Sequence, residues 1–194
     1  MGAGAPVECR DRARYRAQVL FSGYVGLRPG ELFALRAENL SGNFCTIDRS
    51  RSRSGEVGPT KNGRSRTVTV PDVVLDALAG LPPNRSGLLF SSPRDRMWTQ
   101  PSHHRYWSLL RRFAGRPGMD YYELRHAAAT MLLERGVTPW DVAVQLGHID
   151  GGQLVMELYG HPTEDGSRAR VLAAWSREKP PTPIRSGAFR EQAS

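Results

Sequence analysis

The chain has 194 residues, 39% of them apolar and 24% charged, which fits one globular domain with tails and excludes a disordered chain. No apolar run approaches the roughly 18 residues of a membrane span, and two cysteines are too few for a disulfide framework. Lysine and arginine number 27 against 19 acidic residues, a net charge of +8 that favours a polyanionic partner. We therefore expect a cytoplasmic protein that binds a polyanion.

The first part of the chain predicts two helices followed by a small sheet. A helix is expected over residues 10–25, and Pro29 and Gly30 force a turn before a short helix at residues 31–35. The stripe that the first helix buries is predicted at Tyr15, Val19, Ser22 and Val25. Residues 43–70 alternate and are rich in β-branched residues, which is typical of two or three antiparallel strands, with a tight turn at Lys-Asn-Gly.

Helices are predicted to dominate the rest of the chain. They are expected at residues 71–78, 98–114, 120–136, 138–147, 154–158 and 168–175. Pro71 and Thr138 suit the first positions of their helices, and Glu123 three residues after Asp120 forms a capping-box variant. The residues that the helix at 98–114 turns inward are predicted to be Tyr106, Leu109, Leu110 and Phe113.

The fold class that follows is mainly α with a small antiparallel β-sheet (α+β). Residues 1–9 are expected to be a tail or the remnant of a linker, residues 10–178 the main domain, and residues 179–194 a Pro-rich flexible tail. Within the main domain, the sequence Gly-Leu-Leu-Phe at residues 87–90 is expected to be a short buried segment.

Four stretches place chemically active residues at turns and helix starts: GLRPGEL, TKNGRSRTVTVP, YELRHAAAT and LGHIDGGQLVMELYGHP. In chain order their candidate residues are Arg28, Lys61, Arg125, His148 and Tyr159. The order, spacing and local structure of these motifs resemble the catalytic domain of the tyrosine recombinases, the phage-integrase family. The resemblance covers about residues 10–175 and implies the fold of that family, with residues 10–178 as the catalytic domain.

Cleavage of a phosphodiester by a tyrosine explains these residue types. A phenol with a pKa near 10 is only about one part in a thousand ionised at neutral pH, so it needs a base or a positive field. Arginine suits the phosphate because its planar fork donates two hydrogen bonds and keeps its charge. No metal-ligand cluster stands out in the sequence, and we expect neither a metal nor another cofactor.

The resemblance implies a role for each candidate. Tyr159 is the implied nucleophile, with Arg28 and Arg125 holding the phosphate. Lys61 is the implied acid that protonates the leaving 5′-oxygen, and His148 is a base or a hydrogen-bond donor. If the resemblance is set aside, the sequence alone is interpreted with Arg28 as a surface arginine, Lys61 as a solvated turn residue and Tyr159 as an ordinary helix residue. The competing phenols are Tyr106, Tyr121 and Tyr122.

Weaker candidates surround these five residues. Tyr122 stands where the family usually has histidine, and a phenol can donate one hydrogen bond to a phosphate but adds no positive charge. Glu31 is expected either to orient Arg28 or to serve as a first-turn acid favoured by the helix dipole. Arg64 and Arg66 are expected either to contact DNA phosphates or to solvate the strand.

The implied function is site-specific DNA recombination through a 3′-phosphotyrosyl intermediate. The implied partners are double-stranded DNA and a homotetramer on two DNA sites, with an accessory DNA-bending protein as a further candidate. Family members usually carry an N-terminal DNA-clamping domain, and only about ten residues precede the first helix here, which favours a fragment or a truncated copy. Two alternatives stay open: a recombination-inactive DNA-binding remnant, and a nicking-closing enzyme resembling the type IB topoisomerases.

Overall fold

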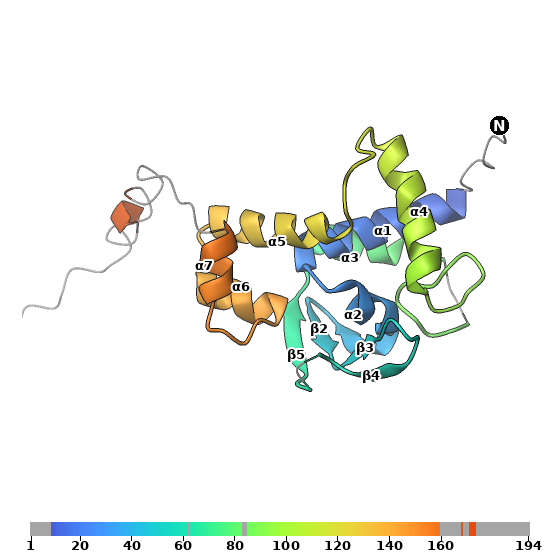
Figure 1. Ribbon diagram of the computed structural model, residues 1–194, viewed down its shortest axis with the longest axis horizontal. Helices are drawn as coiled ribbons and strands as arrows, with labels where there is room; N and C mark the ends of the chain where they lie inside the picture. The colour runs from blue at the N-terminus through green and yellow to red at the C-terminus, as the bar shows by residue number, and fades with distance from the viewer. Residues whose placement is uncertain (1–8, 62, 83–84, 160–167, 169–170, 174–194) are drawn as a thin grey trace, which may run out of the picture. The chain divides into compact units, whose positions relative to one another are not determined.

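The structure is a computed structural model that describes residues 9–61, 63–82, 85–159, 168 and 171–173 (Figure 1). The chain divides into two compact units, residues 1–160 and residues 161–194. None of the helices in the described ranges is long and apolar enough to cross a membrane. The domain boundaries expected after residues 9 and 178 stay predictions.

The first unit is mainly helical, with short strands between its second and third helices. Its helices are α1 (Cys9–Val25), α2 (Pro29–Ala34), α3 (Asp72–Ala79), α4 (Gln100–Phe113), α5 (Tyr122–Glu134), α6 (Pro139–Leu146) and α7 (Gln153–Tyr159), with a 3-10 turn at Ala37–Asn39. Its strands are β1 (Leu40–Ser41), β2 (Phe44–Ile47), β3 (Arg49–Arg51), β4 (Val57–Pro59) and β5 (Arg66–Thr69). The predicted mainly α fold with antiparallel strands is confirmed.

The strands form two separate antiparallel sheets. In the first sheet β2 lies between β1 and β5, with Phe44 opposite Thr69 and Ile47 opposite Arg66. In the second sheet β3 pairs with β4 alone. The predicted number of strands was too low, because β2 and β3 are separated only by Asp48 and yet pair with different strands.

The long helix α1 is the element against which both α3 and α5 pack (Figure 1). Of the stripe predicted on it, Tyr15, Ser22 and Val25 are buried and Val19 is half-buried. The hydroxyl groups of Ser22 and Tyr121 share a hydrogen bond of 2.5 Å inside the core. Helical periodicity therefore located this buried face correctly.

Helix α4 buries only part of the face that was predicted. Of the four residues expected to point inward, Tyr106 and Leu110 are partly buried, whereas Leu109 and Phe113 are 43% and 79% exposed. The buried residues are instead His103 and Trp107. Their rings contact the edge or face of Tyr121 at centroid distances of 4.5 and 5.0 Å. The prediction was wrong for Leu109 and Phe113, because packing against Tyr121, and not the apolar spacing of the helix itself, sets the centre of the buried face.

Helices α5, α6 and α7 pack around a second buried cluster. Its members are Ala129, Val142, Ala143, Leu146 and Val155. Since α5 contacts both α6 and α7, and α6 contacts α7, the three helices form one packed group (Figure 1). The motifs that contain Arg125, His148 and Tyr159 lie on this group or at its ends.

The helix ends follow the capping chemistry of the sequence. Thr138 Oγ1 accepts a hydrogen bond from the Asp141 N–H at 3.1 Å, and the Asp120 N–H donates to the Glu123 carboxylate at 2.7 Å. Gly147 ends α6 in the left-handed conformation, with φ of +73°. Glycine adopts that conformation without the steric penalty of a side chain, so the predicted glycine cap is confirmed.

Three other short segments agree with the predictions where the structure describes them. Leu88 and Phe90 of the predicted buried segment are indeed buried. Helix α7 is one residue longer at each end than predicted, so Tyr159 is its last residue. Residues 168 and 171–173 of the last predicted helix are helical, and its other residues lie outside the described ranges.

Candidate active site

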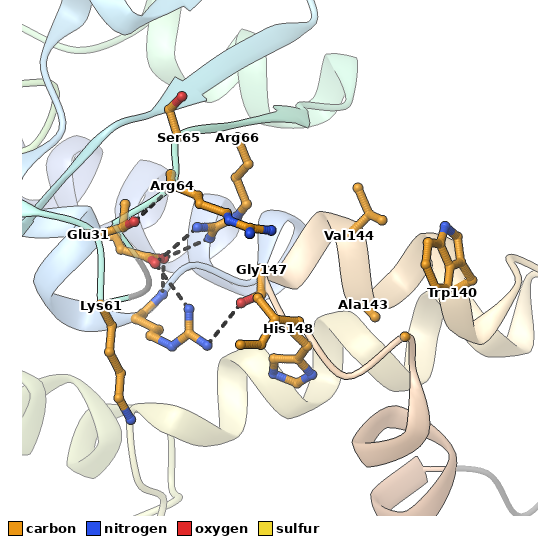
Figure 2. A pocket seen from close by; sticks show the side chains of 14 residues that line it. Glu31, Lys61, Arg64, Ser65, Arg66, Trp140, Ala143, Val144, Gly147 and His148 are labelled. Carbon is orange, nitrogen blue, oxygen red and sulfur yellow. Dashed lines mark hydrogen bonds and ion pairs between the residues drawn. The ribbon is translucent and has the colours of Figure 1, made fainter.

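Six predicted site residues line one cavity of about 290 Å³ in the first unit, among them Arg28, Lys61, Arg64 and His148 (Figure 2). Glu31 and Arg66 line it as well, and Figure 2 shows the dashed contacts that join Glu31 to the arginines. The cavity is formed by the turn before α2, the segment that leads into β5, and the C-terminal end of α6. The fold thus brings together motifs that are far apart in the sequence.

Glu31 holds Arg28 in place at the N-terminus of α2. The backbone N–H of Arg28 donates to Glu31 Oε2 at 3.0 Å, and Nη1 of Arg28 donates to Glu31 Oε1 at 3.1 Å. Arg28 Nη2 also donates to the carbonyl oxygen of Gly147 at 3.3 Å. The Glu31 side chain is 1% exposed and that of Arg28 is 23% exposed. Glu31 therefore both caps the helix and orients Arg28, which combines the two alternatives left open by the sequence.

Arg66 completes the surroundings of the Glu31 carboxylate. Its Nη1 and Nη2 atoms donate to Glu31 Oε1 and Oε2 at 3.0 and 2.8 Å, a bidentate ion pair. Its Nε atom donates to the carbonyl oxygen of Gln145 at 3.3 Å, and only 13% of the side chain is exposed. The expectation that Arg66 solvates the strand is therefore wrong. Its other expected role, contact with a DNA phosphate, stays a prediction.

Arg125 is buried and bound by backbone oxygens. Its Nη1 atom donates to the carbonyl oxygen of Gly26 at 2.6 Å, and its Nη2 atom donates to that of Leu146 at 2.8 Å. Gly26 has φ of +75° and leaves no room for a side chain beside Leu146, so a glycine is needed at this close approach. Burial, and after it the charge of Arg28, lowers the pKa of Arg125 to about 10. The guanidinium is therefore still charged at neutral pH.

His148 accepts a hydrogen bond from Arg125. Nη2 of Arg125 lies 2.9 Å from Nε2 of His148, and because a guanidinium can only donate, the imidazole nitrogen must accept. The proton of the neutral ring is then on Nδ1. Burial, followed by the charges of Arg125 and Arg28, lowers the pKa of His148 below its usual value. The ring is therefore neutral at pH 7 in this state.

The C-terminal end of α6 holds three arginines close together. The carbonyl oxygens of residues 145, 146 and 147 each accept a hydrogen bond from a different guanidinium, those of Arg66, Arg125 and Arg28 in that order. Carbonyl groups at a helix C-terminus carry partial negative charge and suit cations. Three guanidinium groups against the one Glu31 carboxylate leave an excess of two positive charges. An anion such as a phosphate can neutralise that excess.

Lys61 lies on a connection between the two sheets and not on a hairpin. Because β4 pairs with β3 and β5 pairs with β2, residues 60–65 join strands of different sheets. The Gly63 N–H donates to the carbonyl oxygen of Thr60 at 2.8 Å and closes the predicted turn. Lys61 and Arg64 are exposed, and Figure 2 shows the Lys61 ammonium group turned away from the arginines. Their roles in catalysis and in DNA contact stay predictions.

The two tyrosines predicted in the site lie at opposite ends of their helices. Tyr122 is the first residue of α5 and is 41% exposed. Tyr159 is the last residue of α7, and its side chain lies outside what the structure describes. Residues 149–152 connect His148 to α7, whose Val155 is buried in the second cluster. The catalytic roles of both tyrosines stay predictions.

Tyr121, a competing phenol, is poorly suited to attack a phosphate. Its side chain is buried, and its hydroxyl group is hydrogen-bonded to Ser22 Oγ. Burial raises the pKa of Tyr121 well above its usual value, so its phenolate form is even rarer than that of an exposed tyrosine.

The cavity also has an apolar wall that the sequence motifs did not single out. Trp140 and Val144 of α6 line it and are 61% and 50% exposed, and Ile149 beyond the helix is 74% exposed. Figure 2 shows Trp140 and Val144 on the opposite side of the cavity from Lys61. A signal was present in the sequence, because α6 carries apolar residues on its outer face as well as the buried Val142.

Comparisons with known proteins agree with these motifs. Residues 5–165 match the model of the phage integrase family. A Mycobacterium tuberculosis protein named as a prophage phiRv2 integrase is 29% identical over 173 residues, which cover 82% of this chain and 45% of that protein. The tyrosine recombinase XerA of Pyrococcus furiosus is 30% identical over 146 residues, which cover 72% of this chain and 48% of that protein.

A solved structure with a similar fold is the Tn1549 transposon integrase in complex with a circular intermediate DNA. The TM-score is 0.68 at 19% sequence identity, and the match covers 86% of this chain and 60% of that one. The present chain spans less than half the length of the two relatives named above.

Proposed function

The chain belongs to the phage integrase family of tyrosine recombinases, and from that membership we propose that it cleaves and rejoins double-stranded DNA at specific sites. The proposed reaction passes through a 3′-phosphotyrosyl intermediate. The observation that carries the proposal is the pair of cations Arg28 and Arg125, with the neutral ring of His148 beside them, at the end of α6. A short loop connects this helix end to the helix that ends at Tyr159.

Tyr159 is the proposed nucleophile. Its phenolic oxygen forms a bond to the scissile phosphorus while the bond from phosphorus to the 5′-oxygen breaks, and the cleaved strand keeps a free 5′-hydroxyl group. The phenol must lose its proton during the attack. His148 is the candidate base, since its lowered pKa keeps the ring unprotonated at neutral pH. The single lone pair of its Nε2 atom accepts from Arg125 in this structure, so Arg125 must turn toward the phosphate before Nε2 can take the phenol proton.

Arg28 and Arg125 are the proposed phosphate ligands. Their fixed positions suit charge that builds on the non-bridging oxygens during attack, where one preorganised donor is worth roughly 3 kcal/mol. Arg28 is partly exposed and faces the cavity, while Arg125 is held behind it by backbone carbonyls. Tyr122 is proposed to donate one further hydrogen bond to the phosphate.

Lys61 is the proposed acid for the leaving 5′-oxygen. Its side chain is exposed and must turn toward the arginines to reach that oxygen, which a four-carbon stem on a surface turn allows. Rejoining reverses the chemistry, because the 5′-hydroxyl group of a partner strand attacks phosphorus and releases Tyr159. The energy of the broken bond is stored in the phosphotyrosine, so ATP is not required.

The proposed assembly is a homotetramer on two DNA duplexes, acting in the cytoplasm, with an accessory DNA-bending protein as a further partner. The net charge of +8 supports binding to DNA phosphates, with Arg64 as a proposed contact. Residues from Glu164 onward are proposed to contact a neighbouring protomer, and most of them lie outside the described ranges. The integrases and recombinases among the relatives favour neither an inactive DNA-binding remnant nor a topoisomerase.

The test is formation of a covalent adduct on nicked suicide DNA built from the sequence that flanks the gene. Wild-type protein is expected to give a protein–DNA band that survives denaturing electrophoresis, and Tyr159→Phe is expected to give none. Tyr24→Phe, a half-buried tyrosine of α1, is the matched control and should retain the band.

Other outcomes separate the alternatives. Salt-sensitive DNA binding without an adduct, also in a longer chain that includes any N-terminal domain, would point to a DNA-binding remnant. Relaxation of supercoiled plasmid without recombinant products would point to a nicking-closing enzyme. An adduct that persists in Tyr159→Phe would assign the nucleophile to another tyrosine.

A further inference from the structure

The Glu31 carboxylate lies between two guanidinium groups from different parts of the fold. Both of its oxygens accept hydrogen bonds from Arg66, at 3.0 and 2.8 Å. Both also accept from Arg28, one from Nη1 at 3.1 Å and the other from the backbone N–H at 3.0 Å. The Arg66 side chain is 13% exposed against 23% for Arg28, so Arg28 is the more accessible of the two.

Glu31 depends on Arg66 to stay charged in this buried place. Burial acts to raise the pKa of Glu31, and the hydrogen bond and charge of Arg66, ahead of those of Arg28, hold it below its usual value. Removing one partner of a buried ion pair leaves a charge that is poorly compensated. Without Arg66, Glu31 would either bind a proton and loosen its hold on Arg28, or draw the Arg28 guanidinium fully onto itself.

Arg66 also fixes the helix end that holds the other arginines. Its Nε atom donates to the Gln145 carbonyl oxygen, and the next two carbonyl oxygens bind Arg125 and Arg28. A Cβ atom at Gly147 would lie 2.7 Å from Arg66 Cζ, so the guanidinium packs directly against the backbone of the glycine cap. The position of Arg66 is thus coupled to both supports of Arg28.

We propose that Arg66 is a positioning residue, which acts through Glu31 and the end of α6 to aim Arg28 at the scissile phosphate and does not itself bind DNA. This inference rests on the proposed DNA cleavage by the same site. It predicts that loss of Arg66 slows cleavage while the affinity for DNA is unchanged.

The test compares wild type with Arg66→Gln in single-turnover cleavage at saturating protein. The variant is expected to cleave suicide DNA about 100-fold more slowly, close to the loss expected for a phosphate ligand itself. In a double-mutant cycle with Arg28→Lys, the effect of Arg66→Gln is expected to shrink to less than about threefold, because both substitutions remove the same contact.

A neutral substrate separates positioning from loss of the fold. When a methylphosphonate replaces the scissile phosphate, with both diastereomers tried, one negatively charged oxygen is absent and the aim of Arg28 matters less. The rate ratio between wild type and Arg66→Gln is then expected to fall from about 100 to less than about 3. A misfolded variant would lose activity on both substrates. Adding Glu31→Gln to Arg66→Gln removes the unpaired carboxylate and is expected to restore the melting temperature.

Salt dependence of non-covalent DNA binding decides between positioning and direct contact. When a residue that binds a phosphate is removed, the negative slope of log K for DNA binding against log salt concentration becomes less steep by about one. Arg66→Gln is expected to keep the wild-type slope, and Arg64→Gln, an exposed neighbour, provides the comparison for a phosphate contact.

Three results would overturn the inference. The first is a reduced salt slope for Arg66→Gln, which would make Arg66 a DNA ligand. The second is wild-type cleavage by Arg66→Gln, which would leave the proposed function intact and remove only the positioning role. The third is the absence of any adduct from wild-type protein, also in a longer chain that includes any N-terminal domain, which would reject the proposed function and the inference with it.

Discussion

Nη2 of Arg125 donates to Nε2 of His148 across 2.9 Å, and the same Nη2 atom donates to the carbonyl oxygen of Leu146 at 2.8 Å. This sharing fixes the imidazole as a neutral acceptor beside a buried cation. The protonation of His148 thus depends on Arg125, a residue 23 positions earlier in the sequence. Because this contact is tertiary, the pH dependence of the cleavage rate should depend on the fold.

The cleavage rate is expected to be constant from about pH 8 down to about pH 6.5 and to fall at lower pH. The pKa of His148 is lowered, so its Nε2 atom is protonated only below the usual histidine range and blocks acceptance of the phenol proton only there. The rate of single-turnover cleavage by wild type and by His148→Asn is measured between pH 5 and 8. The rate of the variant should not show the fall at low pH. A wild-type rate that rises as pH falls would identify protonated His148 as a donor instead.

Replacing Arg125 with lysine is expected to lower both the free energy of unfolding and the cleavage rate. One ammonium group cannot reach the carbonyl oxygens of Gly26 and Leu146 together, and a lost hydrogen bond to a charged group costs about 2 kcal/mol. Loss of a preorganised donor should slow cleavage about 100-fold or more. Urea unfolding and single-turnover cleavage report the two effects. The control is Arg112→Lys on the exposed face of α4, which should change the free energy of unfolding by less than about 0.5 kcal/mol. An Arg125→Lys variant as stable as wild type would contradict the role of Arg125 in joining the backbone at Gly26 and Leu146.

Tyr122→Phe is expected to slow cleavage about tenfold, since one hydrogen bond to a charged group is worth about 1.5 kcal/mol. Stability should change little because the side chain is 41% exposed. Tyr122→His, which introduces the residue usual in the family, should match or exceed the wild-type rate near pH 6, where an imidazolium adds positive charge. Cleavage by Tyr122→Phe at the wild-type rate would exclude the phenol from the site.

His103 is expected to make the free energy of unfolding about 2 kcal/mol smaller at pH 5 than at pH 7. Burial, with a smaller effect of His104, lowers the pKa of His103 from 6.5 to about 4. The unfolded chain therefore binds this proton first as pH falls, so the stability present above about pH 6.5 is lost progressively between pH 6.5 and 4. Equilibrium urea unfolding at the two pH values measures the difference.

The neighbouring histidine provides the control for that measurement. His103→Gln should largely abolish the pH dependence, whereas His104→Gln, at an exposed position of the same helix, should keep it. A difference that survives in His103→Gln would assign it to other groups.

The sequence located the local motifs that carry the candidate site residues. The Pro-Gly turn after Arg28, the helix start before Arg125 and the glycine cap before His148 each follow from rules that act within a few residues. The same rules placed α1, α5 and α6 and the buried stripe of α1. Local backbone preferences and helical periodicity are properties of a short stretch of chain, so a single sequence is enough to predict them.

The tertiary structure alone decided which charges from distant parts of the chain meet. The ion pair between Glu31 and Arg66 joins residues 35 positions apart, and Arg28 reaches a carbonyl oxygen 119 positions away. Nothing in the period of a helix or strand encodes such pairs, because they arise only when α2, β5 and the end of α6 converge in space. The same reason explains why Leu109 and Phe113 of α4 were wrongly expected inside, since the aromatic partner of that helix, Tyr121, lies outside it. The sequence by itself therefore determined the local motifs that carry the candidate residues, and the packing of distant elements determined how Arg28 and Arg125 are held and that His148 is neutral.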